Sequence, residues 1–283
     1  RLDMKNKRSL IWYLNGDFLP AQDTKIPITD LGLQRGWGVF DFLRTYSGRP
    51  FQLSAHIARF FRSTERSLIN LNKSAEELTQ LVNRLIARNL VVGSVGIKLF
   101  ATAGSSRDGL LSGNKPTLGI MILPLHRYPQ AMYTRGIKLG IFRELRVNPE
   151  VKSINYAAVL VKMAAEKRRG FDDILYVGEN NVVYESARSN FFALINGKWI
   201  TPKEGVLPGI TRGLVIELAR KRYSVREGVL TLAQLRKASE AFVTSTEREI
   251  MPVVGVGDSR IGKGVVGEKT KLLMKEFRKL THH

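Results

Sequence analysis

The amino-acid sequence predicts a mixed α+β fold divided into two domains. Patterns typical of strands and patterns typical of amphipathic helices both occur along the whole chain. Short strand patterns dominate the second half, without the regular strand–helix alternation that a doubly wound sheet requires. The 283 residues are enough for about two domains, and no internal repeat indicates a solenoid.

The first half of the chain contains predicted strands and helices in mixed order. Asn15-Gly16 after an apolar run predicts a tight turn. Ser74-Ala75-Glu76-Glu77 is a capping box, whose side chains bond to the free N–H groups at a helix start. The predicted elements are a strand at 11–14, a hairpin of strands 38–46 and 51–53 around a turn at 47–50, a helix capped by Ser54 with Ile57, Phe60, Phe61 and Leu68 on its apolar side, a helix after Ser74 with Leu78, Leu81, Leu85 and Ile86 on one side, and strands at 95–102 and 117–123.

A proline-containing segment without periodicity, residues 124–132, predicts a linker between a small domain at 1–123 and a larger one at 133–283. In the second domain, Asn196-Gly197 between two apolar runs is a strong hairpin signal. Gly170 is a natural left-handed end for the helix before it. The predicted elements are strands at 136–142, 173–177, 182–186 and 191–195, a helix from about 157 to 170, a helix after Gly209-Ile210-Thr211 with Leu214, Val215 and Leu218 inward, and a closing helix near 269–280.

Composition excludes several classes of protein. Hydrophobic residues make up 43% of the chain and charged residues 25%, which is typical of a folded globular protein. The chain has no cysteine, which excludes a disulfide scaffold, a thiolate metal site and a cysteine nucleophile. The longest apolar run, 118–124, is too short to span a membrane, and no signal-peptide pattern is visible. We therefore expect a cytoplasmic protein with no membrane partner and no metal site.

The net charge of +20 raises the alternative of a basic nucleic-acid-binding protein. Such proteins concentrate Lys and Arg on one face or tail, whereas here the basic residues are scattered. Lys167-Arg168-Arg169 and Arg220-Lys221-Arg222 close predicted helices, where cations complement the negative end of the helix dipole. The pattern favours solvated helix ends over a nucleic-acid interface.

Two segments have polar groups that suit a phosphate. Gly209-Ile210-Thr211 directly precedes a predicted helix, whose first N–H groups are unpaired and lie at the positive end of the dipole. Thr244-Ser245-Thr246 places three hydroxyls at the end of a predicted strand. A plain helix start and an ordinary turn are the structural alternatives for these two segments.

Single residues carry less information. Lys152 precedes an apolar helix, and a lysine held against packed surface can form an imine. Glu185 stands inside a strand-like run, so it is either exposed at an edge or paired with a buried cation. His56 and His126 have no carboxylate or metal partner at a diagnostic spacing and are interpreted as structural.

Taken together, several short motifs follow one another in a specific order along nearly the whole chain. They are Arg35-Gly-Trp-Gly-Val-Phe-Asp41, His56-x-x-Arg59, Lys152-Ser-Ile-Asn-Tyr156, Glu185-Ser-Ala-Arg-Ser-Asn190-Phe, Leu207-Pro-Gly-Ile-Thr-Arg212 and Phe242-Val-Thr-Ser-Thr246. This set resembles the class IV (fold type IV) pyridoxal-phosphate aminotransferases, which include branched-chain aminotransferases, D-amino-acid transaminases and aminodeoxychorismate lyase. The resemblance implies a small α+β domain, a larger barrel-like β domain with helices, and pyridoxal 5′-phosphate bound between them.

The resemblance also implies roles for individual residues. Lys152 would hold the cofactor as an imine and move the proton, which requires an amine of lowered pKa. Glu185 would keep the pyridine nitrogen protonated. The phosphate would be bound by the Arg59 side chain, by hydroxyls, and by backbone N–H groups of a helix start, while Tyr156 would reach the ring hydroxyl; the remaining phosphate ligands are Ile210, Thr211, Ser245 and Thr246.

Substrate binding requires cations for an α-carboxylate. The resemblance is greatest to a less typical subgroup of D-amino-acid transaminases and points to Arg35, Phe40, Lys98 and Arg107, with surface exposure as the alternative for Arg35 and Lys98. Glu247-Arg248 stands where branched-chain enzymes have small residues. The expected reaction moves an amino group from a D-amino acid such as D-alanine to a 2-oxo acid such as 2-oxoglutarate, in a homodimer. An L-branched-chain aminotransferase and the lyase are the alternatives within the family.

Overall fold

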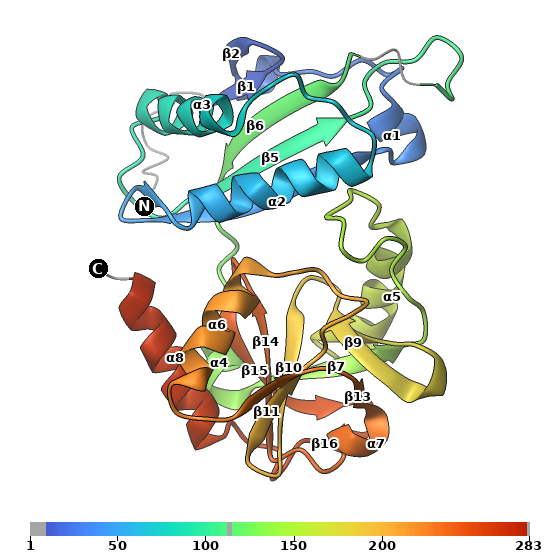
Figure 1. Ribbon diagram of the computed structural model, residues 1–283, viewed down its shortest axis with the longest axis vertical. Coiled ribbons are helices and arrows are strands. Elements are labelled where there is room, and N and C mark those ends of the chain that lie inside the picture. Colours follow the sequence, from blue (N-terminus) through green and yellow to red (C-terminus); the bar gives the residue numbers. More distant parts are fainter. Residues whose placement is uncertain (1–9, 112–114, 282–283) are drawn as a thin grey trace. The chain divides into compact units, whose positions relative to one another are not determined.

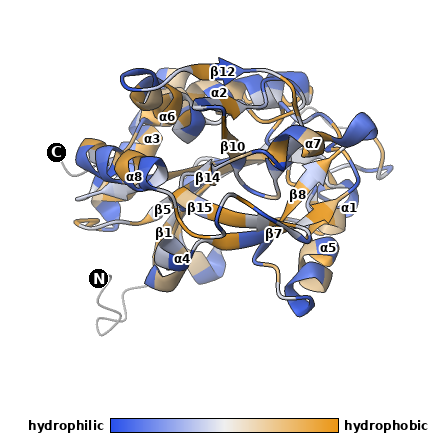
Figure 2. Ribbon diagram, turned by 90° about the horizontal axis from the view of Figure 1, so that it is seen from below, coloured by the Kyte–Doolittle hydropathy of each residue, from blue (hydrophilic) through white to orange (hydrophobic). Residues whose placement is uncertain are grey.

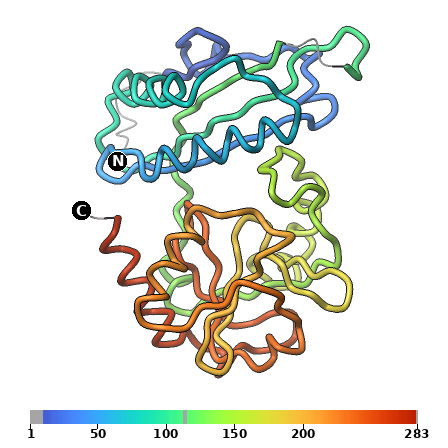
Figure 3. The backbone as a smooth tube through the Cα atoms, viewed as in Figure 1, coloured from blue at the N-terminus to red at the C-terminus, as the bar shows by residue number. Residues whose placement is uncertain are grey.

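A computed structural model describes residues 10–111 and 115–281 of the chain, which forms two compact units (Figure 1). The first unit comprises Arg1–His126 and Val151–Asn155, and the second comprises Arg127–Glu150 and Tyr156–His283. The chain thus leaves the first unit after residue 126, returns to it for five residues and leaves it again, a path that Figure 3 traces.

The return of residues Val151–Asn155 to the first unit differs from the predicted domain boundaries, which place all residues from 133 onward in the second domain. Residues 152–154 run beside the strand that begins at Gly38 and bond to its backbone: Phe40 N donates to Lys152 O (2.8 Å), and Ile154 N donates to Gly38 O (3.0 Å). The predicted linker is also too long, because a helix begins within it at Gln130. Only tertiary pairing assigns Lys152 to the first unit, since its segment is distant from Gly38 in sequence.

In the first unit, the described strands form one six-stranded sheet in the order β2-β1-β6-β5-β3-β4, with each neighbouring pair antiparallel. Helices α2 and α3 cover one face of this sheet (Figure 1). The elements are β1 (Ile11–Leu14), β2 (Asp17–Pro20), a 3-10 turn (Ala21–Asp23), α1 (Leu31–Arg35), β3 (Gly38–Tyr46), β4 (Arg49–Pro50), α2 (Leu53–Arg66), α3 (Ala75–Arg88), β5 (Gly96–Thr102) and β6 (Thr117–Leu123).

Strand β3 shows how the sequence builds this unit. Its side chains alternate between buried and half-buried positions, as expected for a strand with one face against a core. Val39 and Leu43 on the buried face join the apolar cluster beneath α2 and α3. Asp41 lies between them on the same face and is completely buried, so an acidic residue occupies a core position.

Two details of the first helices differ from the prediction. The predicted strand at 51–53 is absent, because β4 ends at Pro50 and α2 already begins at Leu53. Ser54 therefore lies inside the helix rather than capping it, and Gln52 precedes the helix with a left-handed backbone and no capping side chain. Leu68 lies beyond the end of α2 and is 83% exposed. The capping box of Ser74 and Glu77 is confirmed at the start of α3.

In the second unit, the described strands form one ten-stranded sheet with helices around it (Figure 1). The predicted strands, the Asn196-Gly197 turn (φ 49° and 76°) and the closing helix are confirmed. The elements are α4 (Gln130–Arg135), β7 (Ile137–Phe142), α5 (Ala157–Arg168), β8 (Asp173–Val177), a 3-10 turn (Glu179–Asn181), β9 (Val182–Ser186), β10 (Asn190–Ile195), β11 (Lys198–Thr201), α6 (Ile210–Arg220), β12 (Val225–Glu227), β13 (Leu230–Thr231), α7 (Leu232–Leu235), β14 (Glu240–Ser245), β15 (Glu249–Val256), β16 (Ser259–Arg260) and α8 (Glu268–Thr281).

Six of the described strands close into a barrel. The order β10-β14-β15-β7-β8-β9 returns to its start because Glu185 of β9 pairs with Asn190 of β10. One apolar cluster draws residues from all six strands at alternating positions, such as Leu175 and Val177 of β8, so this cluster fills the barrel interior. The hydrophobic (orange) residues of β7 and β15 are visible in Figure 2.

The basic triplets lie where the sequence predicts them. Helix α5 ends at Arg168 and α6 ends at Arg220, each with its basic residues in or just after the last turn. No helix within residues 10–111 and 115–281 is both long and apolar enough to cross a membrane.

Candidate active site

Lys152 lies against β3 in the first unit. Its backbone is held from two sides, since its oxygen accepts from Phe40 N (2.8 Å) and its N–H donates to Ser63 Oγ of α2 (3.2 Å). Its side-chain Nζ lies 4.6 Å from the centroid of the Phe40 ring. Pairing with strand β3 and with helix α2 therefore fixes the backbone of this residue on rigid elements, as a reactive group requires.

Arg59 of α2 is buried and bound to Asp41 of β3. Arg59 Nε and Nη2 donate to the two carboxylate oxygens of Asp41, each at 2.8 Å, which is a bidentate pair. His56 Nδ1 lies 2.6 Å from Asp41 Oδ1. The third guanidinium nitrogen, Nη1, has no hydrogen-bond partner among the described residues, so one donor group of the buried cation remains for a ligand.

The pKa values of Asp41 and His56 in this buried cluster are both lowered, for different reasons. Burial by itself raises the pKa of the Asp41 carboxyl, but the charges and hydrogen bonds of Arg59 and His56 outweigh burial and hold this pKa well below its usual range. Burial lowers the pKa of the His56 imidazole; Asp41 acts in the opposite direction, while the Arg59 and Lys152 charges also lower it. Asp41 is thus charged and His56 neutral in the folded chain at neutral pH.

We expect the lowered pKa of His56 to make the folded state less stable in mild acid. Below the ordinary histidine pKa of 6.5 the unfolded chain binds a proton that folded His56 does not, so the free energy of unfolding falls as the pH falls. In His56→Gln, the free energy of unfolding should change less with pH than in the wild-type chain, as measured by thermal unfolding between about pH 7.5 and 5.5. His126→Gln, at an exposed histidine, is the control. An unchanged slope in His56→Gln would contradict the assignment.

Lys98 and Phe40 lie next to Lys152. Lys98 is half-buried on β5, and its Nζ is 5.0 Å from the centroid of the Phe40 ring, so two ammonium groups lie near one aromatic ring. Burial lowers the pKa of the Lys98 ammonium. The surface alternative for Lys98 is therefore wrong: this cation lies beside the Phe40 ring and is not fully solvated.

Arg35 and Arg107 lie at a different place in the first unit. Both are exposed, as the surface alternative for Arg35 predicts. Arg35 Nε donates to Gly109 O (3.1 Å), which ties the end of α1 to the loop that carries Arg107. The same loop is ordered by Asp108, whose carboxylate accepts from Ser106 Oγ and from Leu110 N and Leu111 N.

Glu185 is the centre of a hydrogen-bond network in the second unit. Its carboxylate is buried and accepts from Arg146 Nη1 (2.6 Å), Leu207 N (3.2 Å) and Asn190 Nδ2 (3.0 Å). Glu185 raises the pKa of Arg146 despite the opposing effect of burial. Of the two alternatives for Glu185, exposure at an edge is wrong: the carboxylate is buried and pairs with Arg146, a cation that is itself half-buried. A guanidinium and two further donors favour the charged carboxylate.

Asn190 joins Glu185 to the start of α6. Its Nδ2 also donates to Leu207 O (2.8 Å), and a Cβ on Gly209 would lie 2.0 Å from Asn190 Oδ1. Glycine at 209 is therefore needed for close packing. No side chain caps the helix that begins at Ile210, so the first N–H groups of α6, including that of Thr211, lack a capping partner.

Ser245 is the last residue of β14 and Thr246 follows it in the turn to β15; both are half-buried. Thr244 lies opposite Asn190 in the sheet, so this strand end lies beside the Glu185 network. Thr244 Oγ1 is buried and has no hydrogen-bond partner among the described residues, and the same holds for Ser189 Oγ. Each of these hydroxyls can donate one hydrogen bond to a bound oxygen atom. Tyr156 is half-buried and packs against the apolar cluster around Phe142 and Tyr176.

Three residues of these networks escape prediction from sequence. Asp41 is marked by one signal, a charged residue at a core position of an alternating strand. Arg146 lies in an irregular stretch that has no periodicity, so no pattern identifies it. Asn190 is recognisable only once β9 and β10 are paired, because its role depends on the closure of the barrel.

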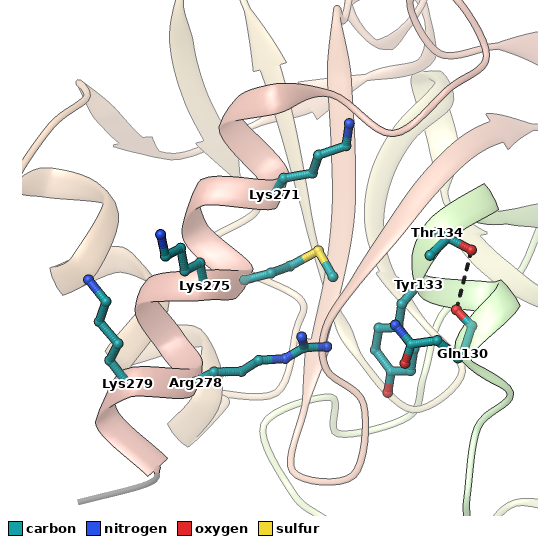
Figure 4. Close-up of a pocket in the computed structure, with 8 residues that line it drawn as sticks. Gln130, Tyr133, Thr134, Lys271, Lys275, Arg278 and Lys279 are labelled. Carbon is teal, nitrogen blue, oxygen red and sulfur yellow. Dashed lines mark hydrogen bonds between the residues drawn. The ribbon is translucent and has the colours of Figure 1, made fainter.

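A separate pocket of about 700 Å³ lies between α4 and α8 and contains none of the predicted site residues. Figure 4 shows Arg278 directed toward Tyr133 and Gln130, whereas Lys275 and Lys279 point away. The lysines therefore do not converge on one ligand. Within the described parts of the chain, no cluster of His, Asp or Glu could hold a metal ion.

Comparison with known proteins identifies the family. The profile of the family Amino-transferase class IV matches residues 38–256, which includes Lys152, Glu185 and the start of α6. This chain is a class IV aminotransferase. The resemblance seen in its motifs is thereby confirmed, and so is its assignment as an enzyme.

Relatives of the aminotransferase carry two different names. A putative branched-chain-amino-acid aminotransferase of Methanocaldococcus jannaschii is 35% identical over 275 residues, which is 94% of each chain. A D-alanine aminotransferase of Staphylococcus epidermidis is 30% identical over 274 residues, covering 94% of this chain and 96% of the relative.

Solved structures agree on the fold of the aminotransferase. The branched-chain amino acid aminotransferase of Escherichia coli has a TM-score of 0.90 at 26% identity, covering 97% of this chain and 95% of that one. A second branched-chain amino acid aminotransferase, from T.th. and solved with pyridoxamine 5′-phosphate, has a TM-score of 0.88 at 25% identity over the same shares. The predicted α+β fold of type IV is confirmed.

Proposed function

We propose that this aminotransferase uses pyridoxal 5′-phosphate to move an amino group from a D-amino acid, such as D-alanine, to a 2-oxo acid such as 2-oxoglutarate. The observation that carries the proposal is the position of Lys152, whose backbone is held by β3 and α2 and whose amine lies 4.6 Å from the centroid of the Phe40 ring, a ring that Lys98 also approaches. Class IV aminotransferases are pyridoxal-phosphate enzymes, and one structural relative contains pyridoxamine 5′-phosphate.

The residues present fit this cofactor. In the first unit a primary amine and a buried guanidinium with one donor left over suit an aldehyde and a phosphate respectively. In the second unit the uncapped start of α6 and the unpartnered hydroxyl of Thr244 suit the oxygens of a bound anion. In this proposal Arg59, the N–H groups of Ile210 and Thr211, and the hydroxyls of Ser245 and Thr246 hold the phosphate.

When bound, pyridoxal phosphate supplies an electron-accepting ring. Glu185 acts on the ring nitrogen: its carboxylate, kept charged by Arg146, holds a proton there. Lys152 Nζ takes the proton from the substrate carbon and later returns it, a general acid–base role that needs a rigidly placed amine. Tyr156 is assigned to the ring hydroxyl.

The substrate assignment depends on cations placed for a carboxylate. Lys98 lies near the same Phe40 ring as Lys152, and burial weakens its hydration, so it is suited to bind the α-carboxylate. Arg35, at the end of α1, bonds to the loop that carries Arg107, and both are assigned to a second, more distant carboxylate. The D-alanine aminotransferase among the relatives supports a D-substrate, and the relative with the branched-chain name supports L-branched-chain amino acids as second choice.

One assay separates these substrates. We expect the purified enzyme to transfer nitrogen from D-alanine to 2-oxoglutarate faster than from L-leucine, by at least about tenfold, because one correctly placed charge contact is worth that ratio. Formation of glutamate and its configuration are measured by chiral chromatography. Lys98→Met should raise the KM for D-alanine more than it lowers kcat. Turnover of L-leucine alone would replace the D-amino-acid assignment by the branched-chain one. Turnover of neither amino acid, together with cleavage of 4-amino-4-deoxychorismate in a separate reaction, would favour the lyase.

The homodimer and the cytoplasmic location remain predictions that the family resemblance and the composition suggest. Sedimentation velocity of the purified enzyme tests the dimer directly, since a monomer of 31.8 kDa is readily distinguished from its dimer.

A further inference from the structure

A buried ion pair lies inside the barrel of the second unit, beside the apolar cluster, where the Ser186 hydroxyl also donates to Asp173 (3.4 Å). Asp173 alternates with Leu175 and Val177 along β8, and both of these belong to the apolar barrel interior. Asp173 accepts a hydrogen bond from Arg248 Nη1, and the two residues are 2% and 1% exposed. Burying two charges costs hydration that their attraction returns only in part, so apolar residues would serve stability at least as well.

Arg248 is anchored at three points. Its side chain reaches Asp173, its backbone N–H donates to Ser245 Oγ (3.3 Å), and its carbonyl oxygen accepts from the Tyr133 hydroxyl (3.3 Å). Its guanidinium carbon also lies 5.2 Å from the ring centroid of Tyr128. The Nη1, N–H and carbonyl of one residue are thus engaged, which fixes the backbone as well as the charge, while Arg248 Nε is buried without a hydrogen-bond partner among the described residues.

The residue held in this way belongs to the tight turn between β14 and β15. Ser245 pairs with Glu249 across the strands, so only 246–248 form the turn. Glu249 has a φ of 56°, a left-handed backbone that is costly for a residue other than glycine. A turn with such a residue persists where its surroundings over-determine it, and the anchored Arg248 is directly adjacent.

The anchor also orients the Ser245 hydroxyl. Because Ser245 Oγ accepts from Arg248 N, its own proton is directed away from that bond and is available as a donor. Thr246 follows in the same turn, and the unpartnered Thr244 Oγ1 precedes it. We propose that Arg248, fixed on Asp173, is a positioning residue that holds this turn so that Ser245 and Thr246 donate to the phosphate of the cofactor.

This inference rests on the proposed function, because it assumes that the turn binds the phosphate of pyridoxal phosphate. It also explains why a buried charge pair is present in the barrel: an arginine long enough to reach Asp173 ties the turn to the barrel interior. Arg248 does not touch the cofactor in this scheme. Its loss should therefore affect the phosphate contribution to binding and leave the rest of the cofactor's binding intact.

The test compares two ligands that differ only by the phosphate. Arg248→Met and Asp173→Asn are made in the full chain, freed of cofactor, and the Kd values for pyridoxal 5′-phosphate and for pyridoxal are measured by absorbance titration. We expect Kd for the phosphate ester to rise about tenfold in each variant, as expected for loss of a charge-assisted hydrogen bond. Kd for pyridoxal should stay at the wild-type value. Arg248→Lys retains the charge, so its Kd for the phosphate ester should lie between those of the wild type and Arg248→Met. This variant replaces Arg248→Met in the test if the methionine variant does not fold.

Glu240→Gln is the matched control, since Glu240 lies on the same strand β14 and accepts from Lys269 N and Thr270 N at the start of α8. It should lower the melting temperature and leave the ratio of the two Kd values unchanged. Equal weakening of both ligands in the Arg248 and Asp173 variants, or no change in the ratio, would overturn the positioning role. If the wild-type chain binds neither ligand, the proposed function itself fails.

Discussion

Replacing Lys152 by alanine should abolish turnover, with a loss of at least about 10³-fold in kcat. The residue is assigned two tasks that no neighbour can take over: covalent attachment of the cofactor and proton transfer at the substrate carbon. Lys98 is near, but it lies on β5 opposite Phe42, and its ammonium is 5.0 Å from the Phe40 ring centroid. An amine placed elsewhere loses most of the advantage of a positioned base.

The measurement combines steady-state transamination with visible absorbance of the purified protein. Lys152→Ala should lack the absorbance of lysine-bound cofactor and should still bind the cofactor through its phosphate contacts. Lys269→Ala is the control, because Lys269 also lies over an aromatic ring, that of Tyr223, but is not one of the assigned site residues. Retention of lysine-bound absorbance in Lys152→Ala would reject the assignment of this lysine.

Glu185→Gln should retain the cofactor and lose turnover on the order of 10²-fold, the typical effect of removing one preorganised electrostatic group. Glutamine preserves the shape of the side chain but cannot keep the ring nitrogen protonated. The change also removes the countercharge of Arg146, which is 15% exposed, so a fall in stability accompanies the fall in activity.

The two effects can be separated. The double variant Arg146→Met, Glu185→Gln removes both charges; it should regain stability relative to Glu185→Gln without regaining turnover. Glu227→Gln is a matched control, since Glu227 also pairs with arginines, Arg212 and Arg220, in the same unit. Should Glu185→Gln turn over at the wild-type rate, the electronic role of this carboxylate would be excluded.

Local sequence patterns predicted much of the fold. The capping box at Ser74, the Asn196-Gly197 turn and the strand at 182–186 depend on interactions between residues close in sequence, and all three are found in the structure. The prediction fails where a local signal competes with tertiary packing. Ser54 is a good cap by itself, but the hairpin before it ends early and the helix begins ahead of it.

For the candidate site, the order of short motifs led to Lys152, Glu185 and the helix start at Ile210. The side chains that pair with the site residues could not be predicted from the order of these motifs. The partner of Glu185 is Arg146, and the partner of Arg59 is Asp41; each pair joins residues from different elements. Neither Arg146 nor the closure of β9 on β10 has a signature in the chain, because both arise from how the barrel closes.

The sequence by itself determined the α+β class, most element positions and the family, since these depend on periodicity, turn chemistry and short motifs. Only the tertiary structure decided that the segment carrying Lys152 belongs to the first unit, that Glu185 is buried against a cation and that Arg248 crosses into the barrel interior. The physical reason is the range of the interactions. Hydrogen bonds within a turn or a cap join near neighbours, whereas buried charges find partners only when distant segments are packed together.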